Sequence, residues 1–309
     1  MNPPRRPFRF GVLTKGAPSR EAWLELLGRA EDGGCSALHM PLHTSPQYAP
    51  FVALADAAAR TGLTVTTLVH TNDLQHPALL ARDATTLAML SDGRFELGIG
   101  AGWKEADYHQ LGLAMDPGPL RVDRLAEAIE VVRKTWSAEP FVFEGKHYTV
   151  RDLQGLAGPR VPLLVGAGGE RMLRLAARTA DIVSFSRSMS AGSTAREVAV
   201  DASLESTERK AAVVRQHLGD RAGEVELHIL VVRAGTGADA QRQLDEYAAA
   251  SGVSAGTAGQ TPEHLLGRDA QELEDMLVER RSRTGISYYV FRDVHLDLVR
   301  PVIERLAGT

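Results

Sequence analysis

The sequence predicts an α/β protein built as one (β/α)8 TIM barrel, with an inserted β-hairpin and a helical insertion before the last strand. Short apolar segments alternate with amphipathic segments of helical spacing, an order that implies parallel strands joined by helical crossovers. The length of 309 residues suits a barrel of roughly 250 residues with insertions. Glycine-rich turns follow two of the apolar segments, as expected where a strand leads closely into a helix.

The N-terminal half predicts four strand–helix steps. Ser19 is placed to cap the first helix, and Gly33 and Gly34 to end it. The turn Ser91–Gly93 separates the third helix from the fourth strand. The predicted strands are Phe8–Thr14, Ala37–Leu42, Leu63–Val69 and Arg94–Ile99, and the helices are Arg20–Asp32, Tyr48–Arg60 and Pro77–Leu90.

The C-terminal half predicts four more steps, interrupted by insertions at about 104–118, 137–160 and 235–283. The first is a polar loop, the second contains a hairpin at Phe141–Val150 and the third contains two or three helices. We expect a single domain over residues 1–309. The remaining predicted strands begin at Val161 and span Ala180–Ser186, Glu224–Arg233 and Ile286–Phe291; the helices are Leu120–Trp136, Glu170–Thr179, Asp201–Leu218 and His295–Leu306.

The composition is that of an ordinary soluble protein, with 44% hydrophobic residues, 24% charged residues and a formal net charge of −4. We expect neither nucleic acid nor membrane as a partner, because there is no basic excess and no apolar run long enough for a signal or a span. Cys35 is the only cysteine, which excludes an internal disulfide and favours a cytoplasmic location. No HExxH motif or cysteine pair predicts a metal site.

In a barrel of this kind the active site forms at the C-terminal ends of the strands. These ends hold glycines, hydroxyls, an indole and imidazoles, but no paired carboxylates and no nucleophile elbow. Such a set suits a large planar cofactor that itself carries the reaction. The strand-end candidates are Thr14, Lys15, Leu42, His43, His70, Asn72, Gly100–Trp103, Ala167–Gly169, Ser184, Ser186 and Arg187.

Two positions have more than one interpretation from the residues alone. Gly168 and Gly169 stand directly before a helix, where free N–H groups and the helix dipole favour a phosphate, although glycines there can also serve only the turn. His43 follows a strand end and is as compatible with a structural role as with a catalytic one. His39, inside the strand, is interpreted as structural.

The chain resembles the bacterial luciferase-like superfamily, in particular its deazaflavin-dependent oxidoreductases. The resemblance runs from about Phe8 to Phe185 and again over the last strand. The motifs that carry it are HPALLARDATTL (76–87), SDGRFELGIGAGW (91–103), RVDRLAEAIEVVRKTW (121–136), FEGKHY (143–148), PLLVGAGG (162–169) and ADIVSFS (180–186).

The resemblance implies that coenzyme F420 or FMN lies over the C-terminal face of the barrel, with a non-proline cis peptide at Thr67 and Leu68 behind the ring. It places the cofactor phosphate on Ala167, Gly168 and Gly169, and makes His43 the catalytic candidate. The expected cofactor-binding residues are Thr67, Leu68, His70, Asn72, Gly100, Gly102, Trp103, Ala167, Gly168, Gly169, Ser184 and Arg187.

The sequence departs from the deazaflavin enzymes at two places. Leu42 stands where they usually have an acidic residue, so any contact that needs a negative charge there is in doubt. Trp103 stands where the sugar-phosphate dehydrogenases of the group have glutamate, which argues for a flatter and more apolar substrate. Arg187 could meet the anionic tail of the cofactor or lie in solvent.

The leading hypothesis is an F420-dependent oxidoreductase that transfers a hydride between the deazaflavin C5 and a small, largely apolar organic substrate. The first alternative is an FMN-dependent monooxygenase that uses O2 with a separate flavin reductase. The second is a non-catalytic flavin-binding protein. Related barrels lead us to expect a homodimer, with a separate flavin or F420 reductase as a further partner.

Overall fold

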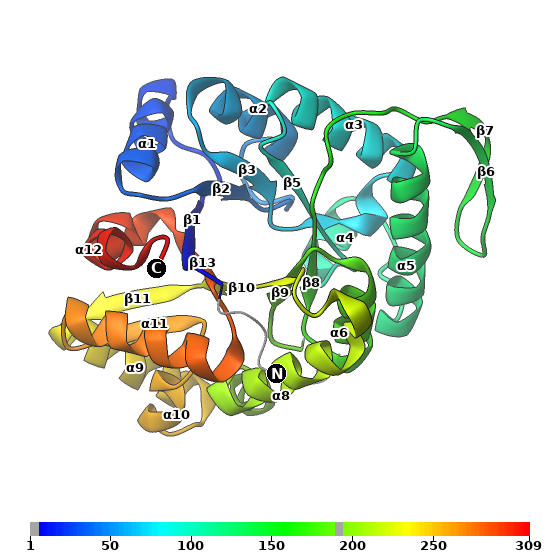
Figure 1. Cartoon of the computed structure of the whole chain (residues 1–309). Helices are drawn as coiled ribbons and strands as arrows, with labels where there is room; N and C mark the ends of the chain where they lie inside the picture. The colour runs from blue at the N-terminus through cyan, green and yellow to red at the C-terminus, as the bar shows by residue number, and fades with distance from the viewer. Residues whose placement is uncertain (1–5, 189–193) are drawn as a thin grey trace.

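The computed structural model describes residues 6–188 and 194–309, and within them eight parallel strands close into a barrel surrounded by helices (Figure 1). The strands follow the order β3-β2-β1-β13-β10-β9-β8-β5, and pairing of β3 with β5 closes the ring. The predicted (β/α)8 barrel is therefore confirmed. Its strands are β1 (Arg9–Leu13), β2 (Ala37–Met40), β3 (Thr64–Thr67), β5 (Phe95–Gly100), β8 (Leu163–Ala167), β9 (Ile182–Phe185), β10 (Glu226–Val231) and β13 (Tyr288–Arg292).

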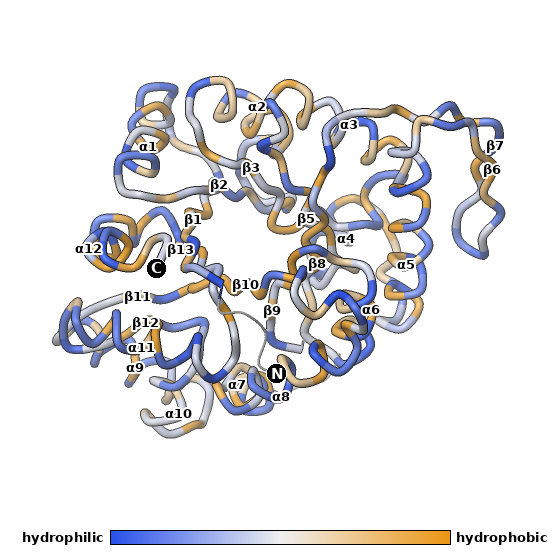
Figure 2. Tube along the Cα trace, viewed as in Figure 1, coloured by the Kyte–Doolittle hydropathy of each residue, from blue (hydrophilic) through white to orange (hydrophobic). Residues whose placement is uncertain are grey.

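The outer helices bury their apolar faces against the strands, which carry much of the hydrophobic colour in Figure 2. Three helices have the bounds that the sequence predicts, namely α1 (Arg20–Asp32), α3 (Pro77–Leu90) and α6 (Glu170–Thr179). Ser19 caps α1, as predicted, by accepting a hydrogen bond from the Ala22 N–H. The other barrel helices are α2 (Pro50–Arg60), α5 (Gly118–Thr135), α7 (Ala195–Asp201), α8 (Leu204–His217) and α12 (Leu296–Leu306).

The insertions contain more regular structure than the sequence suggests. The segment predicted as a polar loop contains α4 (Glu105–Gln110). The hairpin is present as β6 (Pro140–Glu144) and β7 (Thr149–Gln154), and it extends away from the barrel (Figure 1). The third insertion contains the two or three helices that the sequence predicts and, in addition, strands that it does not. It contains a parallel pair of strands, β11 (Arg233–Thr236) and β12 (His264–Gly267), with α9 (Gly237–Ser251), α10 (Ala255–Gly259) and α11 (Ala270–Thr284).

The lower interior of the barrel is filled by a buried polar network. Arg9 forms ion pairs with Glu96 at 2.6 Å and Glu226 at 3.2 Å, and its guanidinium lies 4.1 Å from the centre of the Tyr288 ring. His39 Nε2 lies 2.7 Å from the Tyr288 hydroxyl, which agrees with the structural interpretation of this histidine. A ligand therefore has no room at this level and must approach from the C-terminal end.

One close contact between β5 and the end of β3 depends on glycine. A Cβ built on Gly98 would lie 1.7 Å from the Thr67 carbonyl oxygen, and one on Gly100 would lie 2.9 Å from the Val69 side chain. Gly98 therefore lets the Thr67 backbone approach β5, and Gly100 lets the Val69 side chain approach it. The non-proline cis peptide joins Leu68 to Val69, one residue later than predicted, because β3 stays regular and paired through Thr67.

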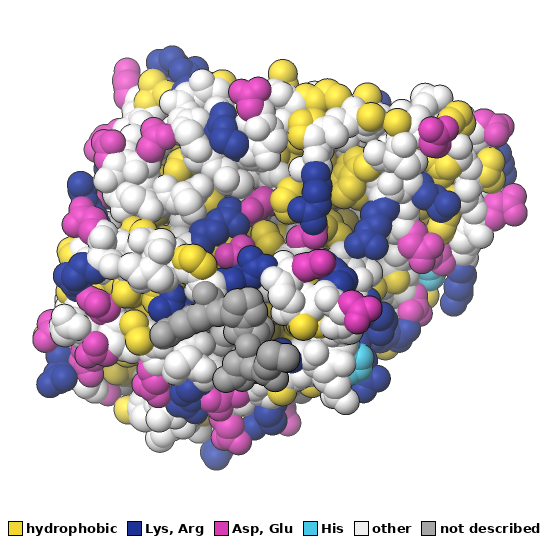
Figure 3. All heavy atoms as spheres, in the orientation of Figure 1, with side chains coloured by type: hydrophobic (Ala, Val, Ile, Leu, Met, Phe, Trp, Pro, Cys, Tyr) yellow, Lys and Arg dark blue, Asp and Glu magenta, His cyan; other side chains and the backbone are white. Residues whose placement is uncertain are grey.

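The outer surface carries acidic and basic side chains interspersed over the face seen in Figure 3. Among the described residues, no helix combines the length and the apolar character that a membrane crossing requires.

Gly98→Ala should destabilise the protein by about 2 kcal/mol or more, because the added methyl group would overlap backbone atoms that cannot rotate away. Gly28→Ala is the matched control, since Gly28 lies inside α1 with no atom within 4 Å of the position that the new methyl group would take. This second change should stabilise by roughly 0.5–1 kcal/mol through helix propensity. Urea unfolding followed by circular dichroism measures both effects, and equal stability of the two variants would contradict the close contact.

Candidate functional site

The upper interior of the barrel is open and apolar. Four inward-facing side chains near the C-terminal ends of the strands are only partly buried, although the layer below them is fully buried. They are Leu13, Leu68, Val69 and Leu230. We call these four residues the apolar floor. A flat, largely apolar ring could cover this floor without burying a charge.

His43 lies beside the floor in a fixed position. Its Nδ1 donates a hydrogen bond of 2.6 Å to Asp107 Oδ2, and the Trp103 ring meets the imidazole edge-on at 5.9 Å between centroids. The Asp107 side chain is only 3% exposed, whereas Trp103 is 52% exposed. The inserted helix α4 thus brings a buried carboxylate to the histidine that follows β2.

The Asp107 carboxylate is held ionised by its donors. Burial acts to raise its pKa, but hydrogen bonds from His43, the Thr44 hydroxyl and backbone N–H, and Lys104 outweigh burial and lower the pKa to about 2. Since an ionised carboxylate only accepts, Nδ1 of His43 carries the proton. The other ring nitrogen, Nε2, is left as the atom that can exchange a proton.

A second network fixes α4 and the glycine turn that precedes it. The Tyr108 hydroxyl donates to Asp73 at 3.0 Å, and Arg124 forms an ion pair with the same carboxylate at 2.9 Å. Arg121 donates to the carbonyl oxygens of Ala101 and Gly102. The Tyr108 contact fixes α4 itself, the arginine contacts fix the segments around it, and the position of Asp107 follows from them.

The turn between β8 and α6 keeps free donors at a helix N-terminus. Gly169 is the N-cap residue of α6, and among the described residues no side chain accepts a hydrogen bond as a cap of this helix. A Cβ on Gly168 would lie 2.5 Å from the Arg187 carbonyl oxygen, so this glycine is required by the neighbouring loop. A Cβ on Gly169 would meet only the Ser188 hydroxyl, at 3.7 Å. The first N–H groups of α6 can therefore hold a phosphate.

The profile of the luciferase-like monooxygenase family matches residues 7–272 of the chain. The chain belongs to this family.

Several F420-dependent enzymes are similar to this luciferase-like protein. An F420-dependent glucose-6-phosphate dehydrogenase of Microbacterium testaceum (strain StLB037) is 31% identical over 189 residues, which cover 57% of this chain and 55% of the relative. The match thus spans about half the length of that curated relative.

Solved structures agree over nearly the whole chain. An F420-dependent secondary alcohol dehydrogenase in complex with an F420-acetone adduct has a TM-score of 0.76 at 18% identity, covering 97% of this chain and 98% of that one. The oxygenating constituent of 3,6-diketocamphane monooxygenase from the CAM plasmid of Pseudomonas putida, in complex with FMN, has a TM-score of 0.70 at 16% identity, covering 98% of both. At these identities the likeness shows the fold alone.

Several predicted cofactor residues of this luciferase-like protein have other partners. The Thr67 hydroxyl is buried and bonds both the N–H and the carbonyl of Gly98, so its side chain is committed to the backbone. The His70 ring packs edge-on against Phe51 of α2, and burial lowers its pKa to about 4. The Asn72 amide donates a hydrogen bond of 3.0 Å to the hydroxyl of Tyr148, the residue directly before β7 of the hairpin. These contacts commit the Thr67 side chain to the fold, whereas the buried His70 Nε2 and Asn72 Oδ1 atoms have no hydrogen-bond partner among the described residues.

The other predicted residues divide between the site and its supports. Leu68 and Trp103 border the mouth of the barrel together with His43. Gly100 and Gly102 serve close packing, since a Cβ on Gly102 would lie 2.1 Å from the Tyr108 hydroxyl. Ala167 is fully buried. Ser184 and Arg187 have partners within the protein. The Ser184 hydroxyl lies 2.8 Å from His228 Nδ1 inside the barrel, and Arg187 pairs with Glu263 at 2.8 Å.

Two contributors to the site are absent from the sequence-based prediction. Asp107 lies in a six-residue helix, which is too short for hydrophobic periodicity to reveal. The only other buried residue of this helix is Tyr108, so the helix has no apolar face that the sequence could reveal. The sequence pattern places Val69 inside the third strand, but the cis peptide directs it over Gly100 and Gly166, where it joins the floor.

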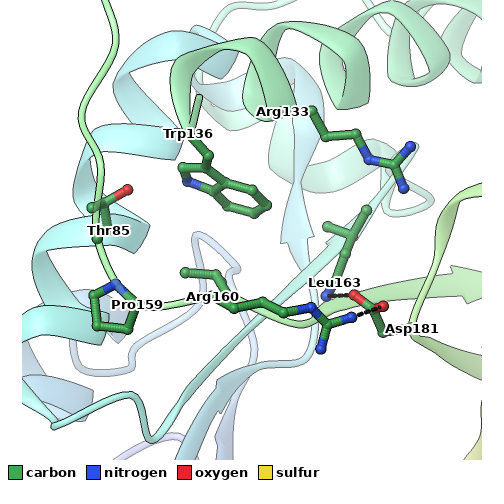
Figure 4. A pocket seen from close by; sticks show the side chains of 9 residues that line it. Thr85, Arg133, Trp136, Pro159, Arg160, Leu163 and Asp181 are labelled. Atoms are coloured by element: carbon green, nitrogen blue, oxygen red, sulfur yellow. Dashed lines mark hydrogen bonds and ion pairs between the residues drawn. The ribbon is translucent and has the colours of Figure 1, made fainter. Parts of the chain in front are cut away.

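A cavity of about 330 Å³ lies at the opposite end of the barrel, before β8 (Figure 4). Arg160 and Asp181 close it with an ion pair of 2.5 Å, and Arg133 donates to the Thr179 carbonyl. Since barrel enzymes react at the C-terminal face, this cavity is not the catalytic site despite its size. Among residues 6–188 and 194–309, no group of three His, Cys, Asp or Glu side chains is placed to hold a metal ion.

Asp107→Asn should change the pH dependence of stability. The folded-state pKa of Asp107 is depressed, so the carboxylate stabilises the fold above its unfolded pKa near 4, and this contribution is lost as pH falls toward 2. The shift corresponds to about 2 kcal/mol. Unfolding free energies at pH 5 and pH 2 should therefore differ less in this variant than in the wild type. Asp220 is exposed, so Asp220→Asn is the control and should show the same pH dependence of stability as the wild type. The same pH dependence in Asp107→Asn would contradict an ionised Asp107 bonded to His43.

Proposed function

We propose that this protein is an F420-dependent oxidoreductase that transfers a hydride between C5 of the deazaflavin and a small organic substrate with a largely apolar reacting end. The observation that carries the proposal is the oriented His43–Asp107 pair beside an apolar, open barrel mouth. The F420-dependent relatives support the choice of cofactor.

The residues at the mouth fit such a cofactor. Leu68 and Val69 offer an apolar surface for one face of the ring, and the uncapped N-terminus of α6 at Gly169 offers N–H donors to a phosphate. When bound there, F420 supplies a carbon that accepts or donates a hydride but does not need O2. The protein then has to orient the substrate, exclude water and move one proton.

His43 is the residue that would move this proton. As an alcohol is oxidised, its carbon loses a hydride and its hydroxyl proton passes to Nε2 of His43. In the opposite direction the protonated Nε2 donates to the oxygen of a carbonyl. Asp107 stabilises the positive imidazolium and holds the ring, while the indole of Trp103 limits access of water.

The FMN-dependent monooxygenase is the second candidate, because an FMN-bound monooxygenase shares the fold. The non-catalytic alternative is less favoured, since a flavin-binding protein has no need of a histidine oriented by a buried carboxylate. A homodimer and a separate flavin or F420 reductase stay predictions.

Cofactor titration distinguishes the first two candidates. Purified protein should bind F420 with micromolar or tighter affinity, measured by quenching of deazaflavin fluorescence, and should bind FMN more weakly. Binding of FMN alone, together with O2 consumption when reduced FMN is supplied, would reject the F420 assignment.

His43→Gln should lower turnover by a factor of roughly 10²–10⁴, because this residue exchanges the substrate proton. The affinity for F420 should change by no more than about twofold, because the residue does not hold the cofactor. Turnover is followed by deazaflavin absorbance with whichever alcohol or carbonyl compound in a substrate panel proves active. His109→Gln, on the exposed side of α4, is the control. Unchanged turnover in His43→Gln would move the proton exchange elsewhere.

A further inference from the structure

A second cavity, of about 320 Å³, lies on the same face of the barrel as His43. It is placed between the strand ends and the insertion formed by β11, α9 and β12. Arg187 follows β9, Val232 follows β10 and Arg292 is the last residue of β13, three strands that are neighbours in the barrel. We call it the arginine cavity. Its lining residues are Arg187, Val232, Arg233, Gln243, Tyr247, His264, Arg292 and His295.

The lining of the arginine cavity has an excess of positive charge. Its lining includes three guanidinium groups and no carboxylate. Arg187 pairs with Glu263, but Arg233 and Arg292 form no ion pair within the part of the chain that the structure describes. The two stretches outside that part, 1–5 and 189–193, contain no Asp or Glu that could neutralise them.

The acidic groups nearest to this lining are already engaged. Asp293 accepts hydrogen bonds from the Thr14 hydroxyl at 2.7 Å and from the Val294 N–H at 2.8 Å. Asp239 accepts from Arg242 and from Gln243. Neither carboxylate therefore forms an ion pair with Arg233 or Arg292, and their oxygens are occupied by other donors.

The wall of the cavity also positions Arg233. The Arg233 guanidinium lies 5.7 Å from the centre of the Tyr247 ring, and His264 meets that ring edge-on at 4.4 Å. Burial lowers the pKa of His264 to about 4, so at neutral pH it adds no charge. Guanidinium groups around a concave space are suited to a carboxylate or a phosphate, which they can bind through paired N–H donors.

We propose that the arginine cavity is a second anion-binding site, separate from the N-terminus of α6, and that it takes a carboxylate or phosphate group. The group belongs either to the substrate, whose reacting end lies near His43, or to the anionic tail of the cofactor. The claim that the bound anion belongs to the substrate or the cofactor rests on the proposed function, whereas the claim that the cavity binds an anion does not.

Inorganic phosphate is the probe for the site. Isothermal titration of the protein without cofactor should show binding that Arg233→Gln and Arg292→Gln each weaken by roughly tenfold or more, as loss of a charge-assisted bond predicts. Arg233→Lys, which keeps the charge, should retain part of the affinity. Arg209→Gln is the control, because this arginine lies on α8 and pairs with Glu205 on the surface, and neither residue lines the cavity. Circular dichroism establishes that each variant is folded.

The same titration on protein saturated with F420 identifies the source of the anion. Phosphate affinity equal to that of the free protein assigns the cavity to the substrate, and exclusion of phosphate assigns it to the cofactor tail. Phosphate binding that is absent at millimolar concentration, or that both glutamine variants leave unchanged, would overturn the site. Failure of F420 to bind while phosphate still binds would reject the proposed function and leave the anion site standing.

Discussion

The close approach of β5 to the end of β3 is the constraint on which the mouth of the barrel depends. Gly98 leaves space for the Thr67 carbonyl, and Gly100 leaves space for Val69. Any side chain at these two positions would push the segment out of the barrel and remove Leu68 and Val69 from the floor. The apolar surface on which a ring can lie is therefore a consequence of two missing Cβ atoms, while the polar network around Arg9 closes the space beneath.

The reactive group of the site is assembled from two distant parts of the chain. His43 follows β2, and its carboxylate partner comes from α4, 64 residues further on. The residue directly before this histidine is the apolar Leu42, and Asp107 provides a negative charge from the insertion. Because Tyr108, Arg121 and Arg124 fix the insertion to the body of the protein, the charge is held as firmly as it would be on a strand.

The barrel was predictable because its signals are local and repeated. Ser19, Pro77 and the turn at Ser91–Gly93 define helix bounds that the structure reproduces. The site was less predictable because the direction in which a side chain points, and the residue that it contacts, depend on parts of the chain that are distant in sequence. Strand alternation does not say that His70 packs on Phe51, or that the glycines before Trp103 accommodate Tyr108. The parallel pair of β11 and β12 was also hidden, since their sequences, RAGT and HLLG, each contain glycine and no run of β-branched apolar residues.

The distribution of charge around the mouth limits what can bind there. On the side of β2, Asp107 balances any positive charge that His43 gains, so this side can exchange a proton without attracting an anion. On the side of β9, β10 and β13, Arg187 is paired with Glu263, but Arg233 and Arg292 form no ion pair within the described residues. A ligand that satisfies both sides must be apolar where it meets the floor and anionic at its far end. A wholly apolar compound would leave the arginines to water, and a compound charged at its reacting end would have to desolvate that charge over Leu68 and Val69.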